Sequence, residues 1–221
     1  NRFILFFLRH GFQHFRFLRT AAGTAKVIAQ IIQTTKIKKL ITFDLHNRAI
    51  TGFFDIPVVE LSAKPIFRDY FAQKIGDKQN SYVVVAPDEG AVKASASIAR
   101  ELGLTIAYMD KRRDLTTGEV RVVGMSGEVE GKHVLIVDDM IVTGSTMMES
   151  AEYLKKMGAV SVSVAATHHL YLPGVQKKLD ESEIDEVVVS DTVQMIGDAV
   201  GQQVSDKLKT LSVASLIVDE L

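Results

Sequence analysis

Short, almost purely apolar segments alternate along this chain with longer segments of helical periodicity. Two of the apolar segments, Tyr82–Ala86 (YVVVA) and Val134–Val137 (VLIV), are rich in β-branched residues. This composition is typical of strands that are covered on both faces. The amphipathic stretches Ala91–Leu102 and Ser145–Met157 follow these strands, and a glycine comes directly after each stretch. The alternation predicts an α/β fold with a mainly parallel sheet flanked by helices.

Composition excludes several other classes of protein. Apolar residues make up 47% of the 221 residues and charged residues 24%, which is the balance of a soluble globular chain. The absence of cysteine excludes a disulfide framework, a thiol nucleophile and a cysteine-ligated metal, and it is compatible with a cytoplasmic location. No charge-free apolar stretch reaches the length of a membrane span, so we expect no membrane insertion.

The two ends of the chain are less regular. Residues 1–43 hold eight Lys or Arg and no Asp or Glu, which fits either a basic edge of the fold or an Arg-rich targeting segment. A helix is expected near Gln202–Lys209. The boundary between domains is weakly marked, and we expect residues 1–61 to form part of one domain and residues 62–221 to form a second.

The most informative segment is Val134–Thr146 (VLIVDDMIVTGST), in which a strand leads through two acids and a Thr-Gly-Ser-Thr turn into a helix. Ligands of open α/β sheets bind at the carboxyl ends of strands. Gly144 allows a close approach of the backbone, and the N–H groups at the helix N-terminus can hold a phosphate. The hydroxyls of Thr143, Ser145 and Thr146 supply further donors.

Two acids, Asp138 and Asp139, precede this turn. They would repel a phosphate but suit ribose hydroxyls or a divalent cation. A plain helix N-cap explains one hydroxyl at this place. It does not explain two adjacent acids and three hydroxyls around a glycine, so the segment favours a site for a phosphorylated sugar. Its residue order matches neither a Walker loop nor a dinucleotide fingerprint.

This segment resembles the phosphoribosyl pyrophosphate loop that phosphoribosyltransferases and ribose-phosphate pyrophosphokinases share. The stretches Leu40–Val58 (LITFDLHNRAITGFFDIPV), Ala86–Lys93 (APDEGAVK) and Met109–Arg113 (MDKRR) are similar to the pyrophosphokinases, in the same order along the chain. The resemblance extends from about Ala25 to Leu221. It implies a phosphoribosyltransferase-like sheet, with a partial second domain of the same type.

The resemblance also implies roles for individual residues. Lys111 and Arg113 are expected to be catalytic, in a basic loop over residues 110–119. Without the resemblance, three adjacent cations would more often be a solvated charge run. The residues expected to bind ribose 5-phosphate are Asp138, Asp139, Val142, Thr143, Gly144, Ser145 and Thr146.

A magnesium ion is the implied cofactor. His46 and Asp88 each follow a strand, and the resemblance makes both of them ligands of Mg²⁺, with His46 also close to ATP. The plainer interpretations are a structural histidine and a helix N-cap. Gln13 is the expected ATP contact that remains from an Arg-Gln-Asp triplet of the family, because Phe12 and His14 replace its other two residues.

The resemblance implies transfer of diphosphate from ATP to the anomeric hydroxyl of ribose 5-phosphate, which gives phosphoribosyl pyrophosphate and AMP. One alternative is an associated or regulatory subunit that only binds ribose phosphate, as the lost Arg would suggest. Another is a phosphoribosyltransferase, which the segments Asp44–His46 and Phe53–Pro57 oppose. We expect a homo-oligomer, or assembly with full-length family subunits, and neither nucleic acid nor membrane as a partner.

Some residues are expected to have no chemical role. The family often has Asp at the position of Val142, so this substitution removes one acceptor for a ribose hydroxyl or a metal-bound water. His168 and His169 are not assigned a catalytic role. The two phenylalanines of Phe53–Pro57 are expected to pack.

Overall fold

A computed structural model describes residues 3–5, 21–113, 120–194 and 205–220. The chain divides into two compact units, which are described separately: residues 1–63 with 214–221, and residues 64–213. The expected domains, 1–61 and 62–221, differ from these units by two residues at the boundary and by the last eight residues, which group with the first unit.

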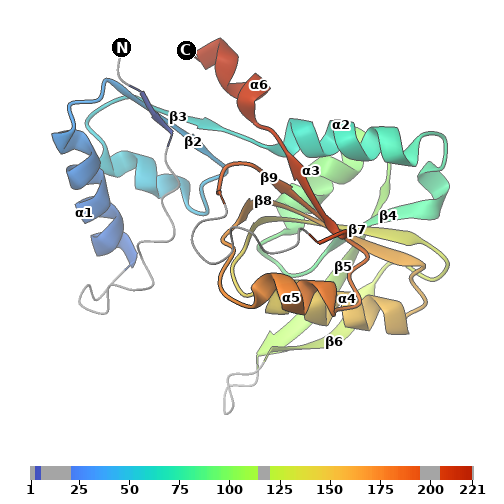
Figure 1. The fold of residues 1–221 in the computed structure, drawn as a ribbon. Helices are drawn as coiled ribbons and strands as arrows, with labels where there is room; N and C mark the ends of the chain where they lie inside the picture. The colour runs from blue at the N-terminus through green and yellow to red at the C-terminus, as the bar shows by residue number, and fades with distance from the viewer. Residues whose placement is uncertain (1–2, 6–20, 114–119, 195–204, 221) are drawn as a thin grey trace. The chain divides into compact units, whose positions relative to one another are not determined.

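The first unit is built on a three-stranded parallel sheet of order β1-β2-β3 (Figure 1). In this unit, Lys39 Nζ forms an ion pair with Glu220 Oε2 at 2.5 Å, which connects the start of β2 to the last described residues. The elements are β1 (Phe3–Leu5), α1 (Ala21–Thr34), β2 (Lys39–Phe43), the 3-10 helix η2 (Arg48–Phe53), β3 (Val58–Leu61), α6 (Ala214–Ile217) and the 3-10 helix η5 (Val218–Glu220).

A small apolar core lies between α1 and the sheet of this unit. Ile32, Ile37 and Leu40 are buried in it, and Phe54 and Ile56 pack against them. Of the two phenylalanines expected to pack, Phe54 is the one found against this cluster.

The second unit is built on a seven-stranded sheet of order β10-β9-β8-β7-β4-β5-β6. All neighbouring strands are parallel except β5 and β6. The elements are α2 (Lys64–Ile75), the 3-10 helix η3 (Gln79–Ser81), β4 (Tyr82–Ala86), α3 (Val92–Leu102), β5 (Thr105–Arg113), β6 (Val120–Ser126), β7 (His133–Ile141), α4 (Ser145–Lys156), β8 (Ser161–His169), α5 (Val175–Asp180), β9 (Glu186–Ser190) and β10 (Leu208–Leu211).

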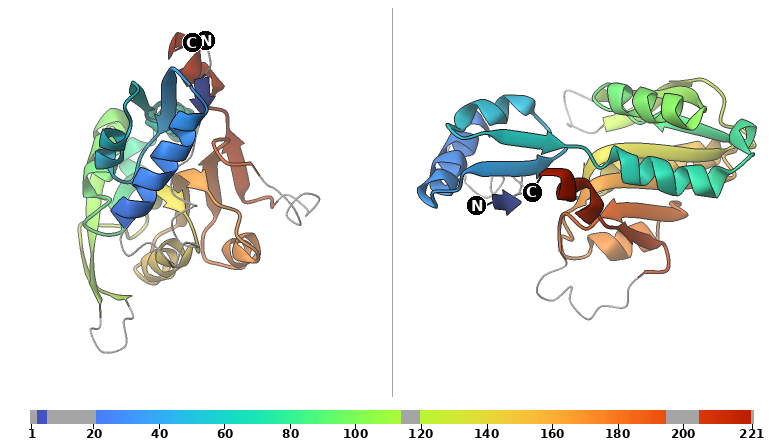
Figure 2. Two further views of the ribbon diagram at one scale, coloured as in Figure 1. Left: turned by 90° about the vertical axis from the view of Figure 1, so that its left-hand side faces the viewer. Right: turned by 90° about the horizontal axis from the view of Figure 1, so that it is seen from above.

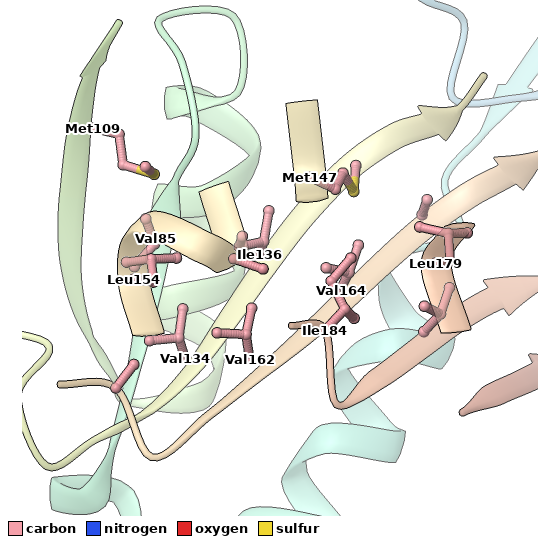
Figure 3. Close-up of a cluster of buried hydrophobic side chains, with 14 of the residues drawn as sticks. Val85, Met109, Val134, Ile136, Met147, Leu154, Val162, Val164, Leu179 and Ile184 are labelled. Carbon is pink, nitrogen blue, oxygen red and sulfur yellow. The ribbon is translucent and has the colours of Figure 1, made fainter. Parts of the chain in front are cut away.

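Helices cover both faces of this sheet, with α2 and α3 on one face and α4 and α5 on the other (Figure 2). Val85 and Ile136 turn to the second face, where Leu154 of α4 packs over them (Figure 3). Val84 and Leu135, one residue earlier in each strand, are equally buried and point to the opposite face. The predicted mixed α/β fold with a mostly parallel, doubly covered sheet is confirmed.

Two expected boundaries are wrong. The basic loop expected over residues 110–119 begins later than expected, because strand β5 continues to Arg113 and pairs antiparallel with β6 from Tyr108 onward. The expected helix near Gln202–Lys209 is contradicted at its end, where Leu208–Leu211 is the edge strand β10, which pairs with β9. Among the described residues, no helix is both long enough and apolar enough to cross a membrane.

The position of Gly127, directly after β6, requires a glycine for two reasons: the backbone conformation and the close approach of a neighbouring residue. Its φ is +104°, and an added Cβ would lie 2.7 Å from Ala107 Cβ. We expect Gly127→Ala to lower the free energy of unfolding by about 3 kcal/mol, through strain and overpacking together. Urea unfolding measures this change. Gly131→Ala is the matched control, because Gly131 has a φ of +69° but open space around it; an equal loss in both variants would rule out the contact with Ala107.

Candidate active site

Three acids lie near the carboxyl ends of the central strands of the second unit. Asp88 comes two residues after β4. Asp138 and Asp139 lie within β7, beyond the last residue that pairs with β4, Ile136. Strand β7 extends past Val137, where the sequence suggested its end, because β8 pairs with it as far as Ile141. The acids therefore lie at the edge of the sheet where α/β proteins bind ligands.

Asp138 is held in an environment that opposes its charge. Burial, and next the charge of Asp139, raise the pKa of Asp138 to about 7. Asp88 contributes further repulsion, while its Oδ1 accepts a hydrogen bond from Ala91 N at 3.0 Å. A cluster of this kind favours either a shared proton or a cation between the carboxylates.

The Thr-Gly-Ser-Thr turn after β7 opens toward solvent at its hydroxyls. Thr143 and Ser145 are exposed, and their Oγ atoms lie 3.0 Å apart. Gly144 has a φ of +73°, and a Cβ there would lie 3.1 Å from Leu179 Cδ2. Helix α4 begins at Ser145, and Met147 N and Met148 N already donate to Gly144 O at 3.1 and 2.9 Å. The earlier N–H groups, those of Ser145 and Thr146, precede these helical bonds. This geometry suits a bound phosphate.

Lys111 reaches from β5 to the first turns of α4. A register shift falls between Asp110 and Lys111 in the pairing of β5 with β6. Lys111 Nζ donates to Ser150 Oγ at 2.9 Å and to Thr146 O at 3.3 Å. Burial lowers the pKa of Lys111, while nearby negative charges, Glu149 first among them, act in the opposite direction. A partly buried cation thus lies beside the phosphate turn.

A cavity of about 1080 Å³ within the second unit is lined by Asp88, Lys111 and two residues of the turn, Ser145 and Thr146, whereas Asp138 and Asp139 are not among its lining residues. Sequence reasoning identified four of its lining residues and missed its apolar wall and an acid on α4. The signal for that acid was weak, because a lone Glu on an amphipathic helix is most often a solvated residue. The cavity is lined by Asp88, Glu89, Gly90, Tyr108, Met109, Asp110, Lys111, Gly124, Met125, Ser126, Ser145, Thr146 and Glu149.

Four other predicted site residues are not among the described residues that line this cavity. His46 is exposed in the first unit, between β2 and η2, and is described with that unit alone. Gln13 lies outside the described residues. Arg113 ends β5 and pairs with Val120 through the backbone. Val142 is half-buried at the start of the turn.

Asp44, two residues before His46, has a structural role that the sequence did not reveal. Its φ is +34°. Its Oδ1 accepts from Ser62 Oγ at 2.7 Å and its Oδ2 from Ala63 N at 2.8 Å. The carboxylate therefore ties the end of β2 to the end of β3 and fixes the direction in which the chain leaves toward His46.

The histidines at the end of β8 are internal. His168 Nδ1 lies 2.8 Å from Thr192 Oγ1, and His169 Nδ1 accepts from Tyr171 N at 3.1 Å. Burial lowers the pKa of His169 to about 4, so this ring is neutral near pH 7. His168 and His169 are 1% and 0% exposed, which fits the expectation that neither is catalytic.

Within the described residues, no group of three or more His, Cys, Asp or Glu side chains is placed to hold a metal ion unaided. Asp88 and the pair Asp138–Asp139 offer carboxylate oxygens beside the phosphate turn. Magnesium is usually bound by one or two carboxylates together with substrate phosphates and waters. The donor set therefore fits a magnesium ion that arrives with a phosphorylated substrate.

Comparison with known proteins finds a consistent family. The pattern of the family described as "Phosphoribosyl transferase domain" matches residues 60–205. A ribose-phosphate pyrophosphokinase of Ralstonia nicotianae is 37% identical over 198 residues, which cover 90% of this chain and 60% of that protein. A ribose-phosphate pyrophosphokinase of Clostridium acetobutylicum is 38% identical, with the same coverage. The chain thus spans about 60% of the length of these curated relatives.

A solved structure supports the same grouping. The phosphoribosylpyrophosphate synthetase of Mycobacterium smegmatis superposes with a TM-score of 0.75 at 32% sequence identity. The match covers 90% of this chain and 62% of that chain. Because it covers nine-tenths of this chain, the similarity extends beyond residues 60–205.

Proposed function

Because the chain belongs to the phosphoribosyl transferase domain family, we propose that it transfers diphosphate from ATP to the anomeric hydroxyl of ribose 5-phosphate. The products are phosphoribosyl pyrophosphate and AMP. The proposal follows the similarity to proteins named ribose-phosphate pyrophosphokinase over 90% of the chain. It would make the chain a transferase of nucleotide biosynthesis.

The observation that carries the proposal is the cavity of the second unit. Lys111, Asp88 and Thr146 come from three separate elements and line one space. A phosphate turn alone would serve any protein that binds ribose phosphate. A partly buried cation beside that turn is what transfer of a charged phosphoryl group needs in addition, because such transfers depend on positioning and charge neutralisation.

Each group has a distinct task in this proposal. The turn at residues 142–146 binds the 5-phosphate through backbone N–H groups and hydroxyls. Asp138 and Asp139 accept hydrogen bonds from the ribose hydroxyls and so orient the sugar. The anomeric oxygen then forms a bond to the β-phosphorus and gives up its proton to solvent water. The bond from that phosphorus to the α,β-bridging oxygen breaks, and AMP leaves with that oxygen. Lys111, and with it Arg113, stabilise the charge on the transferred group.

Magnesium, when bound, would neutralise charge on the phosphates of ATP. Asp88 is the protein ligand that we propose for it within the second unit. The roles of His46 toward magnesium and ATP, and of Gln13 toward ATP, stay those that the family resemblance implies. Val142 stands where the family often has Asp, so its side chain provides no acceptor. The ribose hydroxyls must then rely more heavily on Asp138 and Asp139. The proposed partners are ATP and ribose 5-phosphate, with assembly into a homo-oligomer or with full-length relatives.

The test identifies products by phosphorus NMR from two reactant pairs. ATP with ribose 5-phosphate and magnesium should give phosphoribosyl pyrophosphate and AMP in equal amounts. Phosphoribosyl pyrophosphate with a nucleobase should give no diphosphate. The reverse pattern would establish a phosphoribosyltransferase instead. Binding of ribose 5-phosphate by calorimetry, with no product from either pair, would indicate an associated subunit without catalytic activity.

A further inference from the structure

Ser150 lies at the point where Lys111 meets helix α4. The hydroxyl is 0% exposed and lies one helical turn after Thr146. Lys111 Nζ is 2.9 Å from Ser150 Oγ and 3.3 Å from Thr146 O. No role follows for Ser150 from the proposed chemistry, because the side chain is buried and does not line the cavity.

The direction of the hydrogen bonds is determined by their chemistry. Ser150 Oγ lies 2.6 Å from Thr146 O, a carbonyl that can only accept, so the hydroxyl proton is used in this bond. The lone pairs of the oxygen are then left for Lys111, whose ammonium can only donate. Ser150 and the Thr146 carbonyl therefore present two acceptors to one cation.

This arrangement counteracts two unfavourable effects on the ammonium. Lys111 is partly buried, and it lies near the N-terminal end of α4, where the helix dipole disfavours a positive charge. The carboxylates of Glu149 on α4, Asp88 after β4 and Asp138 on β7 act favourably at longer range. Of the two hydrogen bonds that Lys111 Nζ donates to α4, the one to Ser150 Oγ is the shorter.

We infer that Ser150 is a positioning residue that docks the Lys111 ammonium against the first turns of α4, at the wall of the cavity. Without the hydroxyl, the amine gains freedom and its charged form loses an acceptor. The catalytic consequence rests on the proposed function, whereas the docking itself does not. Ser150→Ala should therefore raise the chemical reactivity of the Lys111 amine even when no substrate is added to the protein.

The experiment measures acylation of Lys111 by acetic anhydride at one fixed pH, with modification read from peptide mass spectra. Lys155 is the internal reference, because this lysine of α4 bonds to Val160 O and Asp185 rather than to a hydroxyl. In Ser150→Ala we expect the ratio of Lys111 to Lys155 labelling to rise about three- to tenfold. Partial unfolding would raise the labelling of Lys155 as well, whereas loss of the docking should raise that of Lys111 alone.

Two further variants sharpen the result. Ser150→Thr keeps the hydroxyl and should restore the wild-type ratio. Ser95→Ala removes a hydroxyl that is equally buried, on α3, and has no partner among the described residues, so the ratio should not change. In turnover, Ser150→Ala should lower kcat about three- to tenfold and leave the KM for ribose 5-phosphate unchanged.

The outcomes separate this inference from the proposed function. An unchanged labelling ratio in Ser150→Ala overturns the docking of Lys111, whatever the activity of the protein. If the ratio of Lys111 to Lys155 labelling rises but the protein forms no phosphoribosyl pyrophosphate, the docking of Lys111 is supported. Only the role of this docking in catalysis is then contradicted. A fall in kcat with an equal rise in KM would overturn the positioning role.

Discussion

Replacement of Lys111 by Met is expected to lower kcat for phosphoribosyl pyrophosphate formation about 10²- to 10³-fold, the usual effect of losing one group that stabilises transition-state charge. Met keeps an apolar stem of similar length, in a cavity that Met109 and Met125 also line. The affinity for ribose 5-phosphate should change little, because the phosphate turn supplies its own donors. Stopped-assay rates and calorimetric affinity together measure the two effects.

The matched control for this change is Lys156→Met on the same unit. Lys156 is an exposed residue of α4 that pairs with Glu152 at 2.5 Å, and surface pairs of this kind contribute little. Its kcat should stay near that of the wild type. An equal loss of kcat and of sugar affinity in Lys111→Met would mean that Lys111 serves binding alone.

Asp138→Asn is expected to weaken ribose 5-phosphate binding about 10- to 100-fold, because a buried charged acceptor for ribose hydroxyls is lost. The same change should stabilise the protein without ligand. Burial and the charge of Asp139 raise the pKa of Asp138 to about 7, which means that the folded state resists ionising this carboxyl. Calorimetry measures the affinity and thermal unfolding the stability.

The effect on stability should depend on pH in a defined direction. The folded state holds its proton up to about pH 7, whereas the unfolded chain releases it near its ordinary pKa of 3.8. Between these values the folded state binds more protons, so wild-type stability falls as pH rises. Asp138→Asn removes this loss. Its advantage in melting temperature should be largest above pH 7 and should disappear toward pH 4.

Asp77→Asn serves as the control for the Asp138 variant. Asp77 is exposed on the loop after α2. Its replacement by Asn should therefore change neither the affinity for ribose 5-phosphate nor the way in which stability depends on pH. If Asp138→Asn melts at a lower temperature than the wild type across this pH range, the surroundings of Asp138 do not disfavour its negative charge in the way that the structure indicates.

The sequence predicted those features of the fold that depend on local pattern. Apolar runs such as Tyr82–Ala86 mark the central strands because both of their faces must be covered. The segment 134–146 predicted the phosphate turn because glycine, hydroxyls and acids have few other reasons to occur together at the end of a strand. Ser145 and Thr146, which line the cavity, were found for the same reason, whereas Asp88 and Lys111 were assigned through the family resemblance.

Other features depend on pairing between distant segments, and local pattern does not contain them. Lys111 and Arg113 read as a polar loop, yet they extend β5 because β6 pairs with them. Residues 208–211 are a strand because β9 offers them an open edge. Ser150 was missed because a serine within an amphipathic helix has no signature until the chain brings Lys111 to it.

The most direct test of the central claim is AMP formation from ATP and magnesium, with and without ribose 5-phosphate, by the wild type and by Lys111→Met. The account predicts AMP formation that requires the sugar and falls about 10²- to 10³-fold in the variant. A folded wild-type protein that binds ribose 5-phosphate but forms no AMP, or forms it equally without the sugar, would contradict diphosphate transfer as the function of this chain.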